Sequence, residues 1–496
     1  MTGDDHPHGR FGGWPTDRGT ARLVAVVCLV GLLVGGVGLF ATSFPTDGTG
    51  SAGSASAIDP SANLSDLHDR SITGENVTVG VVDVTGFDTD HPAIADRVVA
   101  ARSFAAGETV ANDGQNAHGT AAASLVSRVA PDADLYLASF DTGQDYRRAM
   151  AWMVEQDVDV VVAPVTFYGK PDDGSARVDR VAHKAQSQGT LVVASAGNLG
   201  QSHWTGHFDP ADGAHRFDQR LADEDAETED RFEADTRNYL VGDGRREVSV
   251  WLSWEQARPD ANLTLELYAE EQGGSRLVAR SQPYRADDVP NERIHATLDP
   301  DESYYVTVTG GETATGVRFS LSSPTHSFEH RVRSGSIAAP ATAEDVLAVG
   351  AYNGRTGRAE PFSGAGPVPP SRLGIDLVAP DRLSAANHPN GFVGSSAAAP
   401  YVAGVAALVL EVNPDASPAT VQRLLLATAS DVPPQGLDPV SGHGTVEPAR
   451  AVAAAQNGTT QNRVLVMPSF SSAAIETPDT EHVWPHRPHP GPNGDG

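Results

Sequence analysis

The stretch from Gly391 to Leu410 restricts the fold of this chain more than any other. It reads Gly-Phe-Val-Gly-Ser-Ser-Ala-Ala-Ala-Pro-Tyr-Val-Ala-Gly-Val-Ala-Ala-Leu-Val-Leu. Glycines and small hydroxyl residues begin it, and small apolar residues follow from Ser396 onward, which predicts a tight turn leading into a buried helix. Pro400 falls in the first helical turn, where a proline is tolerated. The same pattern also fits a glycine- and alanine-rich core helix that carries no chemistry.

A serine at the start of a helix lies among backbone N–H groups without intrahelical partners, at the positive end of the helix dipole. This position suits a nucleophile whose attack creates an oxyanion. Two upstream motifs favour that function: an apolar strand runs into Asp83, and His118 opens a helix of small residues. Asp83, His118 and Ser396 follow the chain order of the catalytic residues of subtilisin. Here the chain resembles the subtilisin-like serine peptidases, or subtilases.

Further motifs in the same register strengthen this resemblance. The apolar run Leu191–Asn198 ends in Ala-Gly-Asn, which is similar to the subtilase segment whose asparagine donates a hydrogen bond to the oxyanion. The resemblance covers roughly residues 76–198 and 335–429. It also includes the segments Gly335–Ala351, Glu360–Gly366 and Ile375–Pro380.

The resemblance implies a role for each matching residue. Ser396 would be the nucleophile and His118 the general base, while Asp83 would orient the imidazole of His118 and stabilise its charged form. Asn198 and the backbone N–H of Ser396 would form the oxyanion hole. The implied substrates are polypeptides, and the chemistry requires no cofactor and no metal. A structural calcium ion stays an open alternative without assignable ligands.

Three features depart from the usual subtilase pattern. A glycine usually stands two residues after the acid, but Gly86 stands three residues after Asp83. Ser395 lies beside Ser396 and competes with it as nucleophile, although the spacing to the proline favours Ser396. The segment Val162–Gly169 replaces the usual Ser-x-Gly of the substrate-binding wall. We expect its bulky residues to narrow the cleft: Pro164, Phe167 and Tyr168.

Short apolar strands alternate with helices on both sides of a region that has a different pattern. Outside that region the predicted elements include the strand Val77–Asp83 and the helices Ala117–Val129 and Pro418–Ala429; within it they include the strands Glu247–Trp254 and Tyr304–Thr309. Alternating strands and helices predict an α/β fold, a parallel sheet covered by helices on both faces. Between residues 200 and 334 the chain shows an acidic run and then regularly spaced alternating segments, which predict an inserted, jelly-roll-like β-sandwich.

The chain is therefore predicted to contain several parts. Residues 23–41 are uncharged and long enough to cross a bilayer, and the flanking charges place the N-terminus inside. An uncleaved signal anchor and a cleaved signal peptide are both open, and either would export the catalytic region. The predicted parts are a cytoplasmic segment (1–22), the anchor (23–41), a linker (42–75), the catalytic domain (76–199 and 335–456), the insert (200–334) and a largely disordered tail (457–496).

The composition restricts the partners of the chain. Its 35 basic and 64 acidic residues give a net charge of −29, which argues against nucleic-acid binding. Lys170 and Lys184 are the only lysines, and an acidic, lysine-poor surface is typical of proteins that stay soluble in high salt. We therefore expect a halophilic source, such as a halophilic archaeon, although codon bias would give a similar composition. Cys28 is the only cysteine, so no intramolecular disulfide forms.

Two functions are consistent with these observations. The first is a membrane-anchored serine endopeptidase whose catalytic domain lies outside the cell, or is secreted if the anchor is cleaved. The alternative is a catalytically inactive surface protein of the same fold that acts in binding or adhesion through its β-sandwich. The displaced Gly86 and the altered wall segment motivate this alternative.

Overall fold

The structure, a computed structural model, describes residues 60–105, 109–111, 117–217, 235–241, 246–284 and 289–458. The predicted membrane segment (23–41), the acidic run of the insert and nearly all of the C-terminal tail lie outside the described residues. Within the described residues, one helix, α6 (Ser395–Val412), is long and apolar enough to cross a membrane, and it is buried inside the protein. Most of the stretch Gly391–Leu410 thus belongs to a helix in the core of the protein, as its small apolar residues predict.

A mostly parallel sheet forms the centre of the α/β region. Its strands are β1 (Thr78–Asp83), β2 (Val98–Ser103), β3 (Asp134–Ser139), β4 (Val160–Ala163), β5 (Leu191–Ser195), β18 (Leu347–Asn353), β19 (Arg358–Ala359) and β20 (Leu377–Pro380). The order is β19-β18-β5-β4-β1-β3-β2, and β20 pairs with β18. All of these pairs are parallel except β18 with β19. The inner strands are valine- and alanine-rich, as strands covered on both faces should be.

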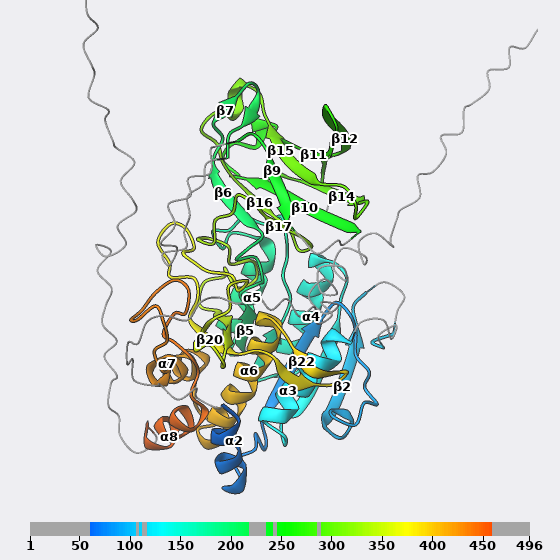
Figure 1. The fold of residues 1–496 in the computed structure, drawn as a ribbon. Helices are drawn as coiled ribbons and strands as arrows, with labels where there is room; N and C mark the ends of the chain where they lie inside the picture. The colour runs from blue at the N-terminus through cyan, green and yellow to red at the C-terminus, as the bar shows by residue number, and fades with distance from the viewer. Residues whose placement is uncertain are drawn as a thin grey trace, which may run out of the picture. The chain divides into compact units, whose positions relative to one another are not determined.

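Helices cover both faces of this sheet, which confirms the predicted fold class. Successive side chains of a strand point to opposite faces, so Val160 and Val162 pack into one core while Val161 and Ala163 pack into the other. The first core includes α3 (His118–Val129) and α6, which lie side by side (Figure 1). The second core includes α4 (Gly143–Glu155) and α5 (Arg177–Ser187).

Two antiparallel sheets form the predicted insert. The strands of the first sheet are β6 (His203–His207), β10 (Glu247–Trp254), β13 (Gln282–Pro283), β14 (Asn291–Thr297) and β16 (Arg318–Ser322). Those of the second are β7 (Pro210–Ala211), β8 (Ala214–His215), β9 (Asn238–Val241), β11 (Thr264–Glu271), β12 (Gly274–Arg280), β15 (Tyr304–Thr309) and β17 (Ser327–Phe328). Their inner faces share one hydrophobic core, to which Val250, Leu267 and Val306 contribute. The orders β14-β10-β16-β6 and β12-β11-β15-β8 are those of a jelly roll.

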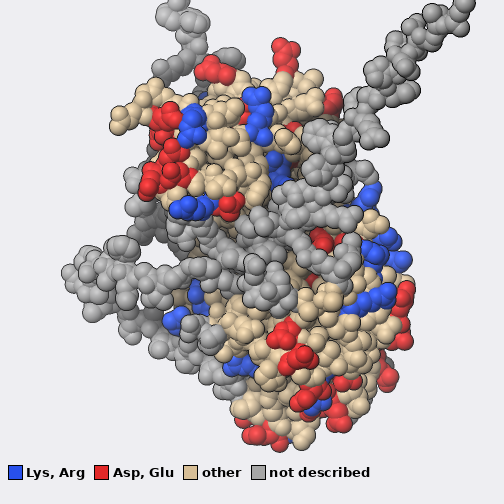
Figure 2. Space-filling view, turned by 90° about the vertical axis from the view of Figure 1, so that its right-hand side faces the viewer, with Lys and Arg blue, Asp and Glu red and all other residues tan. Residues whose placement is uncertain are grey.

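The two ends of the jelly roll meet where it joins the α/β region. The backbone N–H of Phe328 donates to the carbonyl of Gln201 at 3.1 Å, and that of Val332 donates to the carbonyl of His203 at 2.8 Å. The chain therefore leaves the α/β region shortly after β5 and rejoins it at a neighbouring point. On the surface, acidic and basic side chains lie interspersed on the face shown in Figure 2.

Some elements were not predicted. Helix α2 (Pro60–Asp69) lies within the segment interpreted as linker, where Leu64 and Leu67 are buried in the first core. Strand β2 was not predicted, because its sequence Val-Val-Ala-Ala-Arg-Ser forms neither a long apolar run nor an alternating pattern. Helices α7 (Pro418–Thr428) and α8 (Pro448–Gly458) complete the described C-terminal part. Helix α7 is predicted to within one residue, whereas α8 was not predicted.

Candidate active site

The centre of the candidate site is a buried pair formed by Asp83 and His118. Asp83 is the last residue of β1 and His118 is the first residue of α3. Nδ1 of His118 lies 2.6 Å from Oδ2 of Asp83, and both side chains are almost fully buried. Oδ1 of Asp83 accepts hydrogen bonds from the backbone N–H (2.8 Å) and the hydroxyl (2.7 Å) of Thr85. Because Asp83 holds Nδ1, the imidazole is fixed with Nε2 on its opposite side, as a general base requires.

The turn after β1 accommodates the displaced glycine. Gly86 has a φ of 75°, a left-handed conformation that favours glycine. The hydroxyl of Thr85 accepts a hydrogen bond from the backbone N–H of Gly119 at 2.9 Å, which ties this turn to α3. A Cβ atom on Gly119 would lie 2.4 Å from the carbonyl oxygen of Gly86, so only glycine permits this approach. The extra residue therefore leaves Asp83 in contact with His118.

Ser395 and Ser396 are the first two residues of α6, and their surroundings differ. The hydroxyl of Ser395 accepts a hydrogen bond from the backbone N–H of Gly197 at 3.1 Å and donates one to Oδ1 of Asn198 at 3.2 Å. The side chain of Ser395 is fully buried, whereas Ser396 is 7% exposed. Among the described residues, the hydroxyl of Ser396 makes no hydrogen bond. Ser395 is therefore engaged in structural contacts, which favours Ser396 as the nucleophile.

Asn198 lies directly beside the start of α6. Its Oδ1 accepts a hydrogen bond from the backbone N–H of Ser395 at 3.0 Å, and this donor identifies that atom as the amide oxygen. The Nδ2 group, which can only donate, lies on the other branch of the amide. A Cβ atom on Gly394 would lie 2.9 Å from Nδ2, so the turn before Ser396 passes close to this donor. The Nδ2 donor of Asn198 thus lies beside the turn that precedes Ser396.

Phe392 connects the two halves of the candidate site. It is the last residue of β22 (His388–Phe392), shortly before α6, and its ring packs edge-on against that of His118 with 5.0 Å between centroids. The ring of His388 also packs against Phe392, at 5.1 Å. Burial and the nearby His118 both lower the pKa of His388. Sequence reasoning did not identify these residues, because a single aromatic residue among glycines carries no catalytic signal.

The segment that replaces the usual substrate-binding wall is oriented differently from our expectation. The backbone N–H of Phe167 donates to the carbonyl of Ala339 at 2.9 Å, and its ring stacks on Phe140 with 5.9 Å between centroids. The predicted narrowing by Phe167 is therefore wrong, because its ring packs against the second core. Thr166 lies nearer to the site, since its Oγ1 is 3.4 Å from the position that a Cβ on Gly197 would take.

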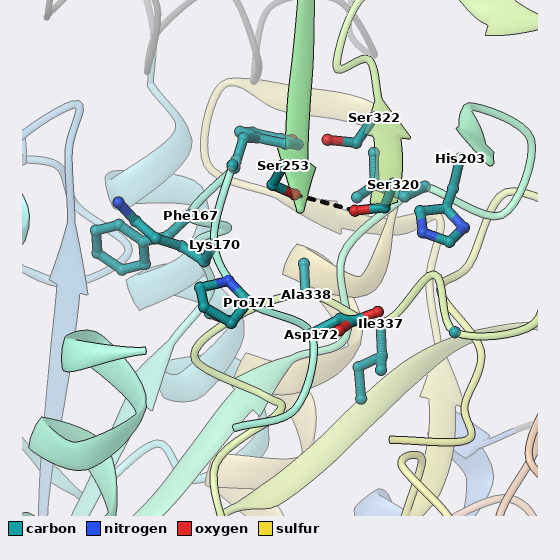
Figure 3. Close-up of a pocket in the computed structure, with 15 residues that line it drawn as sticks. Phe167, Lys170, Pro171, Asp172, His203, Ser253, Ser320, Ser322, Ile337 and Ala338 are labelled. Carbon is teal, nitrogen blue, oxygen red and sulfur yellow. Dashed lines mark hydrogen bonds between the residues drawn. The ribbon is translucent and has the colours of Figure 1, made fainter. Parts of the chain in front are cut away.

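A pocket lies between the end of this wall segment and the first sheet of the jelly roll (Figure 3). Lys170, Asp172 and Ile337 line it from the α/β region, and Ser253 and Ser320 line it from the jelly roll. The hydroxyls of these two serines are 3.0 Å apart. None of the predicted catalytic residues lines this pocket, so it is separate from the candidate site.

A bidentate ion pair and a hydrogen bond tie the jelly roll to the same segment. Arg318 contacts both carboxylate oxygens of Asp172, at 2.9 and 2.6 Å. Nδ2 of Asn291 donates to the carbonyl of Gly169 at 2.8 Å. The insert therefore contacts the residues that immediately follow the wall. In the described ranges, no group of three or more His, Cys, Asp or Glu side chains is arranged to hold a metal ion.

Comparisons with known proteins agree with this architecture. Subtilisin E of Bacillus subtilis is 34% identical over 152 residues, which cover 27% of this chain and 38% of subtilisin E. Subtilisin BL of Lederbergia lenta is 36% identical over 150 residues, covering 27% of this chain and 52% of the relative. The matched region thus spans well under two thirds of the length of these subtilisins.

Solved structures show the same fold. The CspB protease of Clostridium perfringens superimposes with a TM-score of 0.57 at 17% identity, covering 79% of this chain and 96% of that protein. The profile of the subtilase family matches residues 74–219 and 303–444, which together make up more than half of the chain. The interruption of this match falls within the jelly roll. This chain therefore belongs to the subtilase family.

Proposed function

We propose that this protein is a serine endopeptidase that hydrolyses polypeptides through an acyl-enzyme intermediate. The buried Asp83–His118 pair carries this proposal, because a buried aspartate bonded to Nδ1 is the arrangement that prepares an imidazole to accept a proton at Nε2. The start of α6 supports it, since Ser396 and the side chain of Asn198, the candidate nucleophile and the candidate oxyanion donor, lie close together there.

The proposed reaction gives each of these residues one task. The hydroxyl of Ser396 attacks the scissile carbonyl carbon while His118 takes its proton. Nδ2 of Asn198 and the backbone N–H of Ser396 donate to the developing oxyanion. His118 then returns the proton to the leaving amine, the C–N bond breaks, and a water molecule activated by His118 hydrolyses the ester. Asp83 holds the imidazole at Nδ1 and stabilises the imidazolium.

The cellular setting is part of the same proposal. A chain with a membrane segment at residues 23–41 and the catalytic region outside the cell would act on extracellular or surface polypeptides. The acidic, lysine-poor composition supports activity in concentrated salt. The inactive alternative loses one of its two motives, because the displaced Gly86 does not separate Asp83 from His118.

Hydrolysis of a fluorogenic peptide in high salt tests the proposal. We expect turnover by the wild type and a loss of about 10⁶-fold in kcat for Ser396→Ala, the size found for the equivalent change in subtilisin. Ser187→Ala is the matched control, because this exposed serine on α5 donates only to a carbonyl of its own helix. Absence of wild-type turnover, or unchanged turnover in Ser396→Ala, would contradict the proposal.

A further inference from the structure

A second buried acidic group lies behind the candidate nucleophile, outside the predicted triad. Asp381 directly follows β20, and Glu360 directly follows β19. Their exposed fractions are 6% and 3%, so both carboxyl groups lie within the protein. Acidic side chains are rarely this buried unless they are paired or hydrogen-bonded. Their contacts therefore indicate what holds them there.

Asp381 contacts the turn that leads into α6. Its Oδ2 accepts a hydrogen bond from the backbone N–H of Gly394 at 3.1 Å. Gly394 has a φ of 111° and is the residue directly before Ser395. Asn198 binds the next backbone N–H, that of Ser395, at 3.0 Å. Two side chains from the segments that follow β20 and β5 thus hold two consecutive amides immediately before Ser396.

Asp381 has two charged neighbours, which are Glu360 and Arg382. Nε of Arg382 lies 2.8 Å from Oε1 of Glu360 and 3.8 Å from Oδ1 of Asp381. Oε1 of Glu360 also accepts from Nδ2 of Asn353 at 3.0 Å, and its backbone carbonyl accepts from Arg333 at 2.8 Å. Glu360 is thus well anchored. By contrast, no N–H group among the described residues donates a hydrogen bond to Oδ1 of Asp381, and the Asp381 carboxyl lies against the carboxyl of Glu360.

This arrangement is costly to maintain, because a buried carboxyl oxygen without a donor destabilises the fold. Burial, with a further contribution from Glu360, raises the pKa of Asp381 to about 7. An apolar side chain at position 381 would avoid this cost but would leave the N–H of Gly394 without its acceptor. The hydrogen bond from the backbone N–H of Gly394, in the turn before Ser396, is the contact that offsets this cost.

We propose that Asp381 is a positioning residue, whose bond to the Gly394 amide fixes the backbone that presents the Ser396 hydroxyl and the Ser396 N–H to the substrate. The inference rests on the proposed function, since it assigns a role in presenting that nucleophile. Asp381 does not touch the substrate. It acts through Gly394, so its loss affects the chemical step more than substrate binding.

Replacement of Asp381 tests this inference. We expect Asp381→Ala to lower kcat by about 10- to 100-fold, because misplacement of reacting groups by about 1 Å costs up to about 10²-fold. The KM for peptides should change by less than about twofold, as expected for an interaction that acts on the transition state. Asp381→Asn keeps an acceptor oxygen for Gly394 and should restore kcat to within about threefold of wild type. Asp381→Ser, which keeps a polar group but is too short to reach Gly394, replaces Asp381→Ala if that variant fails to fold.

Asp179→Ala is the matched control for a purely structural effect. Asp179 is also buried, and it also accepts one backbone hydrogen bond at 3.1 Å, from Ala176, but it lies at the start of α5. The Asp179→Ala variant should lose stability as Asp381→Ala does, while its kcat stays near that of the wild type. Hydrogen exchange gives a readout that does not depend on turnover: peptides covering Gly391 to Ser396 should exchange faster in Asp381→Ala and not in Asp179→Ala.

The outcomes separate the two proposals. If the wild type hydrolyses peptide, and Asp381→Ala has the same kcat and the same hydrogen exchange as the wild type, the inference is overturned and the proposed function stands. An equal loss of kcat in Asp179→Ala would also overturn it, because the effect would then be structural. A wild type that neither turns over peptide nor reacts with an active-site probe would contradict the proposed function, while faster exchange in Asp381→Ala would still support the positioning of the turn.

Discussion

The α/β region and the jelly roll use charged and polar side chains in different ways. In the α/β region, Asp83, Asp381 and Asp179 are buried and bound to backbone amides or to another buried side chain. In the jelly roll, the ion pairs lie mainly at the surface, as that of Arg276 with Glu271 does at 2.6 Å, and the buried Glu266 is paired with the exposed Arg280. Surface ion pairs contribute little to stability, whereas buried acids are expensive and stay buried where a specific contact needs them. Two of these buried acids, Asp83 and Asp381, lie at the carboxyl ends of parallel strands, where we propose that the chemistry takes place.

Removal of His118 or Asp83 should have the largest effect. We expect His118→Ala to lower kcat by about 10⁶-fold and Asp83→Asn by about 10⁴-fold, as for the equivalent groups of serine peptidases. Steady-state hydrolysis of a peptide, with circular dichroism to verify folding, measures both effects. A folded His118→Ala variant with normal turnover would contradict the proposal that the α/β region, and not the jelly roll, carries the chemistry.

Loss of the oxyanion donor should have the next largest effect. Asn198→Ala is expected to lower kcat by about 10²- to 10³-fold, the range found for the corresponding donor in subtilisin, with little change in KM. Because Oδ1 of Asn198 also holds the backbone of Ser395, Asn198→Asp is an informative companion: it keeps an acceptor for Ser395 but loses the donor. Equal, near-normal kcat values in both variants would show that Asn198 does not act on the oxyanion.

The buried acid Asp179 should make stability depend on pH. Burial raises its pKa to about 7, above that of the unfolded chain, so the folded state binds more protons between about pH 4 and 7. The stabilisation present at low pH is therefore lost as the pH rises through 7. In Asp179→Asn, the hydroxyl of Thr342 can accept from the new amide instead of donating to a carboxylate. Thermal unfolding at pH 5 and pH 8 should show a smaller fall in Tm for Asp179→Asn than for wild type, and an equal fall would contradict this assignment.

Charge removal on the jelly roll should have the smallest effect. Arg276 is exposed and pairs with Glu271 and Glu302 on strands and loops of the insert. We expect Arg276→Ala to leave kcat and KM unchanged and to alter Tm only slightly, since exposed pairs are screened by salt. A marked loss of peptide hydrolysis in this variant would show that the outer surface of the insert takes part in substrate binding.

Much of the α/β fold could be predicted because its strands are apolar and its helices are amphipathic or small-residue runs. The predicted strand Val77–Asp83 and helix Ala117–Val129 differ by one residue at their starts from the observed β1 and α3. In the insert, Glu247–Trp254 and Tyr304–Thr309 were predicted with the bounds that the structure gives. These elements could be predicted because they depend on the local spacing of apolar residues, which can be read from a single sequence.

The remaining features depend on contacts between distant parts of the chain. Phe167 was wrongly interpreted as a cleft residue. Its position is set by backbone pairing with Ala339, which lies far along the chain and is not a local signal. Asp381 carries no signal of its own, because its role appears only when Gly394 and Glu360 are folded around it. The predicted roles of Asp83, His118, Asn198 and Ser396 stay predictions until activity is measured.

Covalent labelling with a fluorophosphonate probe, followed by peptide mapping, tests the central claim most directly. The probe reacts with a serine hydroxyl only where a base and an oxyanion hole activate it. We predict a single adduct on Ser396 in the wild type, no adduct in Ser396→Ala or His118→Ala, and an adduct still on Ser396 in Ser395→Ala. An adduct on Ser395, or a folded wild type that never reacts, would contradict the account.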